Sequence, residues 1–97
     1  MDEQAKRILL DIARTSIKAA IKQEPKPPVS YNHPDLQGKL GVFVTLKTHG
    51  QLRGCLGCFL SVMPLYQTVS EIAASAAMED PRFENNRITL SEFNDLE

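Results

Sequence analysis

The stretch that decides the fold is Gly41-Val42-Phe43-Val44-Thr45-Leu46-Lys47, which is followed after a short turn by residues 51–56. Aliphatic residues alternate along it with aromatic, hydroxyl and charged ones. Most of them are β-branched or bulky, which is typical of a β-strand. Because Thr48-His49-Gly50 has the composition of a turn, residues 51–56 are predicted to return as the second strand of a hairpin.

The returning strand contains Leu52-Arg53-Gly54-Cys55-Leu56-Gly57, here named the LRGCLG segment. Strand alternation predicts Leu52 and Leu56 on one face, and Arg53 and Cys55 on the other. Its two glycines would weaken a plain strand. They therefore indicate a bulge, or a close approach of the backbone to another group.

An amphipathic helix is predicted before the hairpin. Apolar and small residues recur there at steps of three and four, which places them on one stripe of an α-helix. These residues are Ala5, Ile8, Leu9, Ile12, Ala13, Ser16, Ile17, Ala20 and Ile21. The helix must stop by about Glu24, because the prolines that follow cannot donate backbone hydrogen bonds. From there to Lys39 we expect an extended connector.

A second helix is predicted after the hairpin. It is expected to begin near Pro64, with Ser61 as one candidate cap, and to end before Pro81. Thr89 and Glu92 have the spacing of a capping box, which predicts a short third helix. The predicted fold class is therefore α+β, with a hairpin sheet packed against two long helices.

This set of elements leaves part of the sheet uncovered. A lone hairpin is marginally stable in water, and the sequence ends at Asp95-Leu96-Glu97, where another strand could follow. We expect residues 1–97 to form a single domain that is one part of a larger mixed α/β domain. The alternative is a subunit that completes its sheet in a homo-oligomer.

Composition narrows the functional classes. The 97 residues carry 11 basic and 12 acidic side chains, which lowers the odds of a general nucleic-acid binder. No apolar run approaches the roughly 20 residues that span a bilayer, and the first ten residues lack the pattern of a secretion signal. Two cysteines are too few for a disulfide scaffold. We therefore expect a cytoplasmic protein with no membrane partner.

The LRGCLG segment holds the densest group of residues that could carry chemistry. Cys55 is the candidate nucleophile, because it lies at a strand end shortly before a helix N-terminus, where an anion or thiolate is favoured. Arg53 can hold a carboxylate or phosphate through two parallel hydrogen bonds, and Gly54 and Gly57 would let a ligand approach the backbone. In the structural alternative the thiol is a small buried apolar group, the glycines form a bulge, and Arg53 is a surface charge.

Asp80-Pro81-Arg82-Phe83 places opposite charges at the end of the second helix. Arg82 could join Arg53 in an anion-binding pocket. The structural interpretation, which we favour, has Arg82 pairing with Asp80 or satisfying backbone carbonyls.

Cys55 and Cys58 form a C-x-x-C pattern that begins within a strand, unlike the thioredoxin motif, which begins a helix. A zinc site would need further ligands, and the spacing of His33 and His49 matches no usual pattern. Both histidines are expected to be solvated. We expect no metal and no cofactor.

Four blocks of the sequence occur in the order found in the AMMECR domain: residues 41–46, the LRGCLG segment, Met63-Pro64-Leu65 and Glu79-Asp80-Pro81-Arg82-Phe83. The chain resembles this family, whose prokaryotic members are called AmmeMemoRadiSam system protein A. The family's hexapeptide L-R-G-C-I-G is matched with Leu56 in place of isoleucine. Cys58 stands where the family often carries serine or threonine, so the C-x-x-C pattern looks incidental.

The resemblance implies an α+β architecture with a larger mixed subdomain and a smaller β-rich one. Family domains are about double this length, and the resemblance implies a strand directly after Leu96. The family has no settled activity. Its prokaryotic gene neighbours, a Memo-like protein and a radical SAM enzyme, hint at a shared modification pathway by association alone.

Three functions remain open from the sequence. The favoured one is an enzyme or enzyme partner that binds a small anionic substrate beside the LRGCLG segment, with Arg53 and Arg82 orienting it and Cys55 as the nucleophile. The second is a non-catalytic protein-binding or adaptor module, with RNA disfavoured because aromatic residues are few. The third gives the LRGCLG segment a purely structural role.

Overall fold

The predicted hairpin is present in the computed structural model, which describes residues 2–26 and 32–96. Strand β1 (Leu40–Thr48) pairs antiparallel with β2 (Gln51–Leu60). His49 and Gly50 form the two-residue turn with φ values of 51° and 77°. Positive φ at both positions is the geometry of a type I′ turn, whose twist matches that of the strands it joins. Residues 27–31 of the predicted connector lie outside the described residues.

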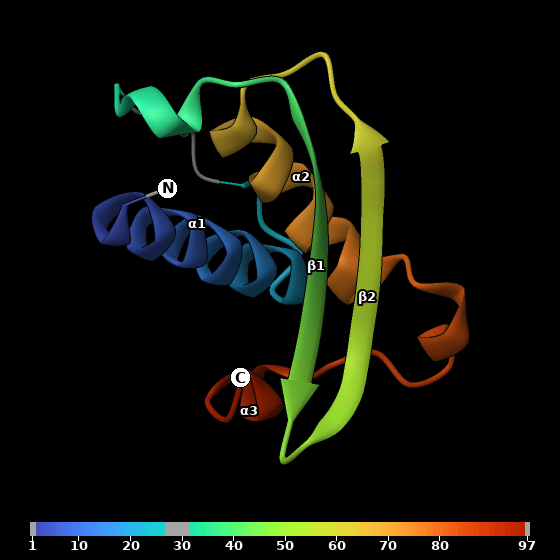
Figure 1. Cartoon of the computed structure of the whole chain (residues 1–97). Coiled ribbons are helices and arrows are strands. Elements are labelled where there is room, and N and C mark those ends of the chain that lie inside the picture. The colour runs from blue at the N-terminus through green and yellow to red at the C-terminus, as the bar shows by residue number, and fades with distance from the viewer. Residues whose placement is uncertain (1, 27–31, 97) are drawn as a thin grey trace.

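Two long helices cover one face of the hairpin, α1 (Glu3–Ile21) and α2 (Leu65–Met78), as Figure 1 shows. Their apolar stripes meet the inward side chains of β1 in a core built around Leu46, with small residues of α2 against the sheet. The buried members of this core are Ile17, Leu46, Ala73, Ala76, Ala77 and Ile88. The α+β class is therefore confirmed.

The N-terminus of α1 is capped by a side chain, whereas the cap predicted for α2 is absent. Asp2 caps α1 by accepting the N–H of Ala5 at 2.7 Å. At α2 the predicted cap, Ser61, is wrong: Pro64 occupies the N-cap position and no side chain caps the helix. The Ser61 hydroxyl instead bonds the Thr68 hydroxyl at 2.7 Å, which ties the loop before α2 to its first turn.

A β-bulge interrupts the LRGCLG segment. Leu46 of β1 lies opposite Gly54, but the next residue, Lys47, lies opposite Leu52, so Arg53 is the additional residue of the bulge. The bulge, together with the close approach of Gly54 to the backbone of α2, confirms both interpretations of the glycines. It also shifts the alternation, so the prediction that Leu52 and Leu56 share a face is wrong: Leu56 packs against the core, and Leu52 lies opposite exposed Lys47.

The C-terminal segment runs from the edge of β2 to the edge of β1, past the turn end of the hairpin (Figure 1). It contains the 3-10 helix η2 (Pro81–Phe83) beside β2 and the short helix α3 (Leu90–Phe93). The capping box of Thr89 and Glu92 at the start of α3 is confirmed. Within residues 2–26 and 32–96, no helix is both long and apolar enough to cross a bilayer.

Gly54 is required because β2 passes against the backbone of α2 there. A methyl group on Gly54 would overlap the carbonyl oxygen of Ala76, an atom that cannot move without shifting the helix. Gly54→Ala is therefore expected to lower the free energy of unfolding by roughly 1–3 kcal/mol or more, measured by urea titration. Gly38→Ala is the matched control, since its added methyl group has ordinary contacts. Equal stability of the two variants would contradict the close approach.

Candidate functional site

A buried carboxylate organises the outer edge of β2. Asp80, only 2% exposed, accepts the backbone N–H of Cys55 at 2.9 Å through Oδ2. It also accepts the backbone N–H of Arg82 at 3.0 Å and two guanidinium bonds, from Nε at 3.1 Å and Nη2 at 2.7 Å. The Arg82 guanidinium holds the pKa of Asp80 well below its usual value, against the opposing effect of burial. Asp80 therefore links β2 to η2 as an ionised group.

Arg53 makes the second link from the LRGCLG segment to the C-terminal segment. Its Nε donates to Oε2 of Glu92 at 2.7 Å, and its Nη2 donates to Oε1 of Glu92 and to the carbonyl of Asn86. The residue is 7% exposed, so it is not the surface charge of the structural alternative. Hydrogen bonds from Arg53 lower the pKa of Glu92, which also closes the capping box of α3.

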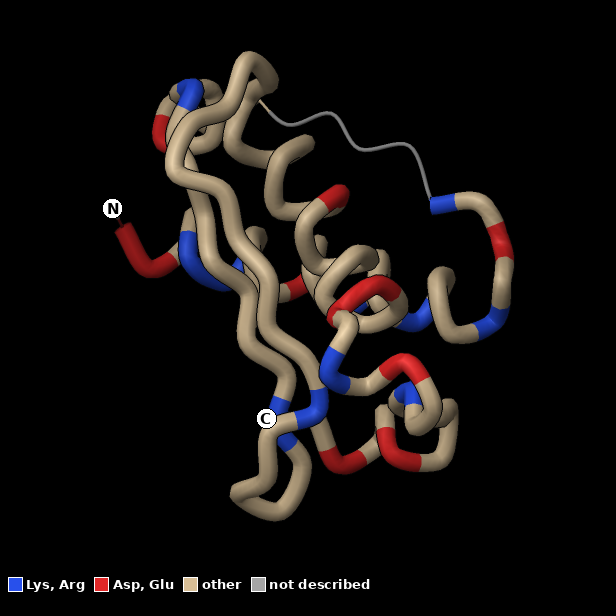
Figure 2. Tube along the Cα trace, turned by 90° about the vertical axis from the view of Figure 1, so that its right-hand side faces the viewer, with Lys and Arg blue, Asp and Glu red and all other residues tan. Residues whose placement is uncertain are grey.

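Arg53 and Arg82 come together on one aromatic ring. Their guanidinium carbons lie 5.4 and 5.8 Å from the centroid of Phe83. Arg87 joins them by donating to the carbonyl of Asp80 at 2.6 Å. Figure 2 shows the contrast: the middle of both strands carries no charged residue, whereas charges gather in the segment beside β2. The predicted structural pairing of Arg82 with Asp80 is present.

The Cys55 thiol lies on the outward face of the hairpin and is partly exposed. It sits opposite Thr45, with Sγ and Oγ1 3.3 Å apart. The Arg82 guanidinium donates to Asp80 Oδ2, the oxygen that also accepts the Cys55 backbone N–H, and Asp80 raises the pKa of this guanidinium. A thiol and a guanidinium thus share an exposed position at the edge of the sheet.

The C-x-x-C pattern does not form a joint site. Cys58 lies opposite Val42, whose side chain packs toward the helices, whereas Cys55 lies opposite exposed Thr45. Residues three apart on a strand point to opposite faces, so the two thiols cannot coordinate one ion or form a disulfide.

Both glycines of the LRGCLG segment have a packing partner. Gly54 faces the backbone of α2, and the ring of Phe43 lies across Gly57, where a methyl group would overlap it. An aromatic ring over a glycine on the neighbouring strand restores the contact area that the glycine lacks. The role of Gly54 and Gly57 in admitting a ligand stays a prediction.

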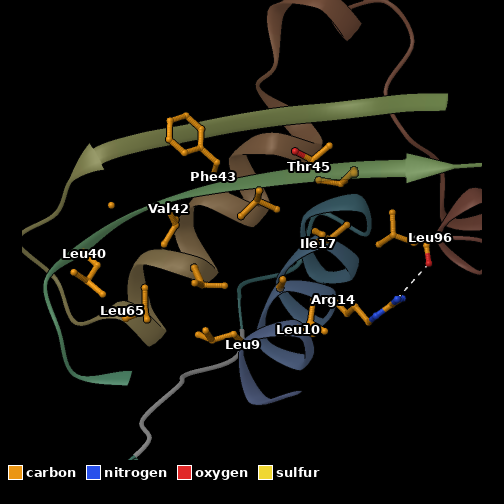
Figure 3. Close-up of a pocket in the computed structure, with 15 residues that line it drawn as sticks. Leu9, Leu10, Arg14, Ile17, Leu40, Val42, Phe43, Thr45, Leu65 and Leu96 are labelled. Atoms are coloured by element: carbon orange, nitrogen blue, oxygen red, sulfur yellow. Dashed lines mark hydrogen bonds between the residues drawn. The ribbon is translucent and has the colours of Figure 1, made fainter. Parts of the chain in front are cut away.

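An apolar groove of about 450 Å³ lies elsewhere, between α1 and the edge of β1 (Figure 3). Its walls include Leu9, Leu10 and Leu40, and none of Arg53, Cys55 and Arg82 lines it. The sequence did not single out this groove, because it is formed by residues that are far apart in the chain.

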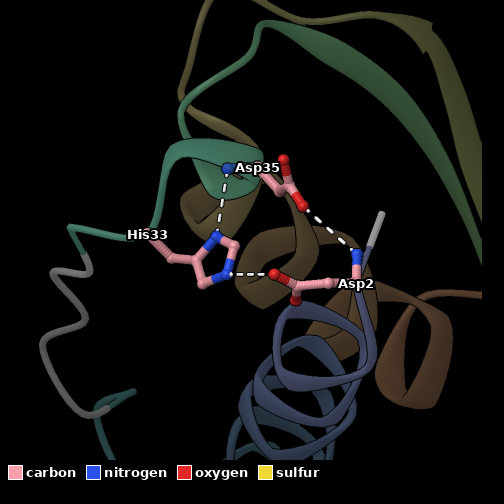
Figure 4. Close-up of side chains that lie close together, drawn as sticks. All are labelled: Asp2, His33 and Asp35. Carbon is pink, nitrogen blue, oxygen red and sulfur yellow. Dashed lines mark hydrogen bonds and ion pairs between the residues drawn. The ribbon is translucent and has the colours of Figure 1, made fainter.

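Three ligand-type side chains gather at the start of α1 (Figure 4). His33 Nε2 pairs with Asp2 at 3.0 Å, and its Nδ1 accepts the N–H of Asp35 at 3.1 Å. Asp2, His33 and Asp35 could hold a metal ion by composition. In this structure their bonds tie the segment before β1 to α1. The expectation of a solvated histidine holds for His49, with a side chain 78% exposed, and is wrong for His33, at 16%.

Sequence reasoning missed two partners that define the site. Glu92 was recognised for its capping box, but its ion pair with Arg53 joins residues 39 positions apart. The bond from the Cys55 N–H to Asp80 spans 25 positions. No local pattern marks such contacts. The one available signal was Asp80, an acidic residue directly after the predicted second helix.

Comparison with known proteins shows which family has this fold and hexapeptide. The family model described as AMMECR1 matches residues 10–97. Protein LS215_2104 of Saccharolobus islandicus is 39% identical over 87 residues, and Protein PF1979 of Pyrococcus furiosus is 37% identical over 95 residues. The crystal structure of the uncharacterised protein PH0010 from Pyrococcus horikoshii superposes with a TM-score of 0.73 at 35% identity. The chain belongs to the AMMECR1 family.

The chain spans less than half the length of these relatives. It covers 38% of the Saccharolobus protein and 44% of the Pyrococcus furiosus protein, which in turn cover 86% and 91% of this chain. The match to PH0010 likewise covers 91% of this chain and 45% of that one.

The Arg53–Glu92 ion pair makes the free energy of unfolding depend on pH. Since the pKa values of Glu92 and Asp80 are lowered in the folded state, both carboxylates stabilise the fold above their unfolded pKa values of about 4. That stability is lost as the pH falls through the lower folded values. Glu92→Gln should cost roughly 1–3 kcal/mol at pH 7 and flatten the loss between about pH 5 and 2, measured by urea titration.

Glu84→Gln is the control for this prediction, because Glu84 is an exposed acid in the same segment. It should change stability by less than about 0.5 kcal/mol. If Glu92→Gln kept the full acid dependence of the parent, the ion pair would have no energetic role.

Proposed function

We propose that this chain binds a small anionic ligand beside the outward face of β2, at Arg82 and Cys55, as an enzyme or as the partner of one. The observation that carries the proposal is that one oxygen, Asp80 Oδ2, accepts hydrogen bonds both from the exposed guanidinium of Arg82 and from the backbone N–H of Cys55. A guanidinium has five N–H donors, and Asp80 accepts from Nε and Nη2 only. With the side chain 58% exposed, the other donors are available to a carboxylate or phosphate.

The roles of the two arginines differ in this proposal. Arg82 contacts the ligand, whereas buried Arg53 is a positioning residue that fixes Phe83 and the segment around it. The charge balance favours weak binding, since Asp80 and Glu92 already pair with these two guanidinium groups. Specificity would then come from contacts to the thiol and the neighbouring aromatic ring.

The neighbours of the thiol favour binding over covalent catalysis. The Thr45 hydroxyl lies 3.3 Å from Cys55 Sγ, and the Arg82 guanidinium shares Asp80 Oδ2 with the Cys55 backbone N–H; neither group removes a proton at neutral pH. Cys55 as a nucleophile would need a base from the ligand or from a partner protein. The proposal therefore assigns the thiol a place in the binding site and no proton transfer.

Alkylation with reagents of different charge tests this proposal. Iodoacetate is anionic and iodoacetamide is neutral, so a local positive charge raises the ratio of their rate constants at Cys55. Arg82→Gln should lower that ratio roughly two- to fivefold, the range expected for one exposed charge close to the sulfur. Rates are measured for each thiol by mass spectrometry at moderate ionic strength.

Cys58 is the internal control, because it lies on the other face of β2, and Arg7→Gln on the exposed side of α1 controls for net charge. An unchanged ratio in folded Arg82→Gln, or the same change at Cys58, would overturn the proposed anion site.

A second candidate function is protein binding through apolar side chains of the hairpin. Phe43 and Phe59 contact each other edge to face at 5.3 Å, with Phe59 85% exposed. Leu60 and Val62 continue the apolar surface at the end of β2, both more than four-fifths exposed. Contiguous apolar surface of this kind is typical of an interface.

Affinity capture separates the two functions. If the hairpin binds a protein, the same partner should be retained by the parent and by Cys55→Ser, and lost with Phe59→Ser. Phe59 is suitable because its exposed ring contributes little to the core. Retention by Phe59→Ser with loss in Arg82→Gln would favour the anion site instead.

A further inference from the structure

The outer edge of β2, on the side away from β1, is covered along only part of its length. Asp80 accepts the N–H of Cys55 on this edge at 2.9 Å, and the segment after α2 lies beside the half of β2 nearest the turn (Figure 1). The loop after β2 leaves over β1 toward α2 (Figure 1). Because the sheet has two strands in the part of the chain that the structure describes, residues 57–60 form an edge with no neighbouring strand there.

The backbone N–H groups of Gly57 and Phe59 point out from this edge. In an antiparallel pair, residues whose N–H turns toward the partner strand alternate with residues whose N–H turns away. Because the Cys55 N–H turns away from β1 toward Asp80, the N–H groups two and four residues later turn the same way. Neither of them has a hydrogen-bond acceptor among the described residues. Two donors of this edge are therefore available to another chain.

The edge formed by residues 57–60 lacks the features that prevent strand addition. Natural sheets protect an exposed edge with lysine, proline or a bulge. Residues 57–60 are Gly-Cys-Phe-Leu, and the bulge of β2 lies farther along, at Arg53. The side chains of Phe59 and Leu60 are 85% and 87% exposed. An uncharged edge flanked by exposed apolar side chains favours binding of an extended peptide as an additional strand.

The side chain of Asp80 determines where an added strand must end. Its Oδ2 takes the place that a carbonyl oxygen of a neighbouring strand would have beside Cys55, so a strand paired with Gly57 cannot continue past it. The Arg82 guanidinium lies at that point, because it donates to the same Oδ2. Asp80 uses Nε and one N–H of Nη2, which leaves the end-on pair of donors on Nη1 and Nη2. This pair can bind a carboxylate through two parallel hydrogen bonds.

We propose that residues 57–60 and Arg82 bind the C-terminal end of an extended peptide from another protein. The inference rests on the proposed anion site and identifies its ligand as a terminal carboxylate. Opposite charges fix the direction of the peptide. With its C-terminus at Arg82 it runs antiparallel to β2, whereas a parallel peptide would place its amino terminus against the guanidinium. The N–H groups of Gly57 and Phe59 donate to carbonyls of the peptide.

A matched pair of peptides tests this inference. The probe is acetyl-Lys-Val-Thr-Val-Thr-Val with a free carboxylate, and its control is the same sequence with a C-terminal amide. Each is titrated into the isotope-labelled chain and followed by NMR. The carboxylate form should bind roughly fivefold more tightly or better, the effect of one charge-assisted pair, and should slow amide exchange at Gly57 and Phe59. In Arg82→Gln the two peptides should bind equally, whereas Arg7→Gln, a control for net charge, should keep the preference.

Equal affinity of the two peptides for the parent chain, or binding that leaves exchange at Gly57 and Phe59 unchanged, would overturn the inference without any variant. Acetate separates this failure from failure of the anion site. If acetate shifts the Cys55 amide signal in the parent and not in Arg82→Gln, while the peptide does not bind, the anion site stands and the peptide edge is wrong. Protection of Gly57 and Phe59 that rises with protein concentration, as light scattering detects dimers, would assign the edge to a second copy and also overturn the inference.

Discussion

The structure depends on one interaction, the hydrogen bond from the Cys55 backbone N–H to the buried carboxylate of Asp80. A strand with a free edge leaves backbone donors without partners, and a buried carboxylate without donors is unstable. The Cys55 N–H gains an acceptor, and the Asp80 carboxylate gains a donor. Because Arg82 neutralises Asp80 and Pro81 turns the chain, the segment after α2 is held against β2, where Phe83 packs under the guanidinium groups of Arg53 and Arg82. The placement of the Arg82 guanidinium beside the backbone of Cys55 follows from this bond.

Most residues of the LRGCLG segment have a structural cause that is visible in their contacts. Arg53 binds Glu92 from a bulge, Gly54 admits the backbone of α2, Leu56 fills the core and Gly57 lies under Phe43. The side chain of Cys55 is partly exposed, and the bond that this residue makes to buried Asp80 comes from its backbone. The hexapeptide is thus a scaffold that presents one thiol beside one guanidinium.

The elements that the sequence predicted correctly are those defined by local chemistry. The hairpin, the two long helices and the capping box of α3 each depend on residues within a few positions of one another. Ser61 failed as a cap because its hydroxyl has a better partner in Thr68. The faces of Leu52 and Leu56 were assigned wrongly because one additional residue, Arg53, shifts the alternation. Contacts such as Arg53 with Glu92 could not be predicted, since they are set by how distant segments pack.

The most direct test of the central bond is amide hydrogen exchange at Cys55, measured by NMR in the parent chain and in Asp80→Ala. The Cys55 N–H should exchange slowly in the parent, together with amides of the hairpin core, because its acceptor is buried. In a folded Asp80→Ala variant it should exchange as quickly as an unpaired edge amide. Rapid exchange of Cys55 in the parent, under conditions where the core of the hairpin is protected, would contradict the account.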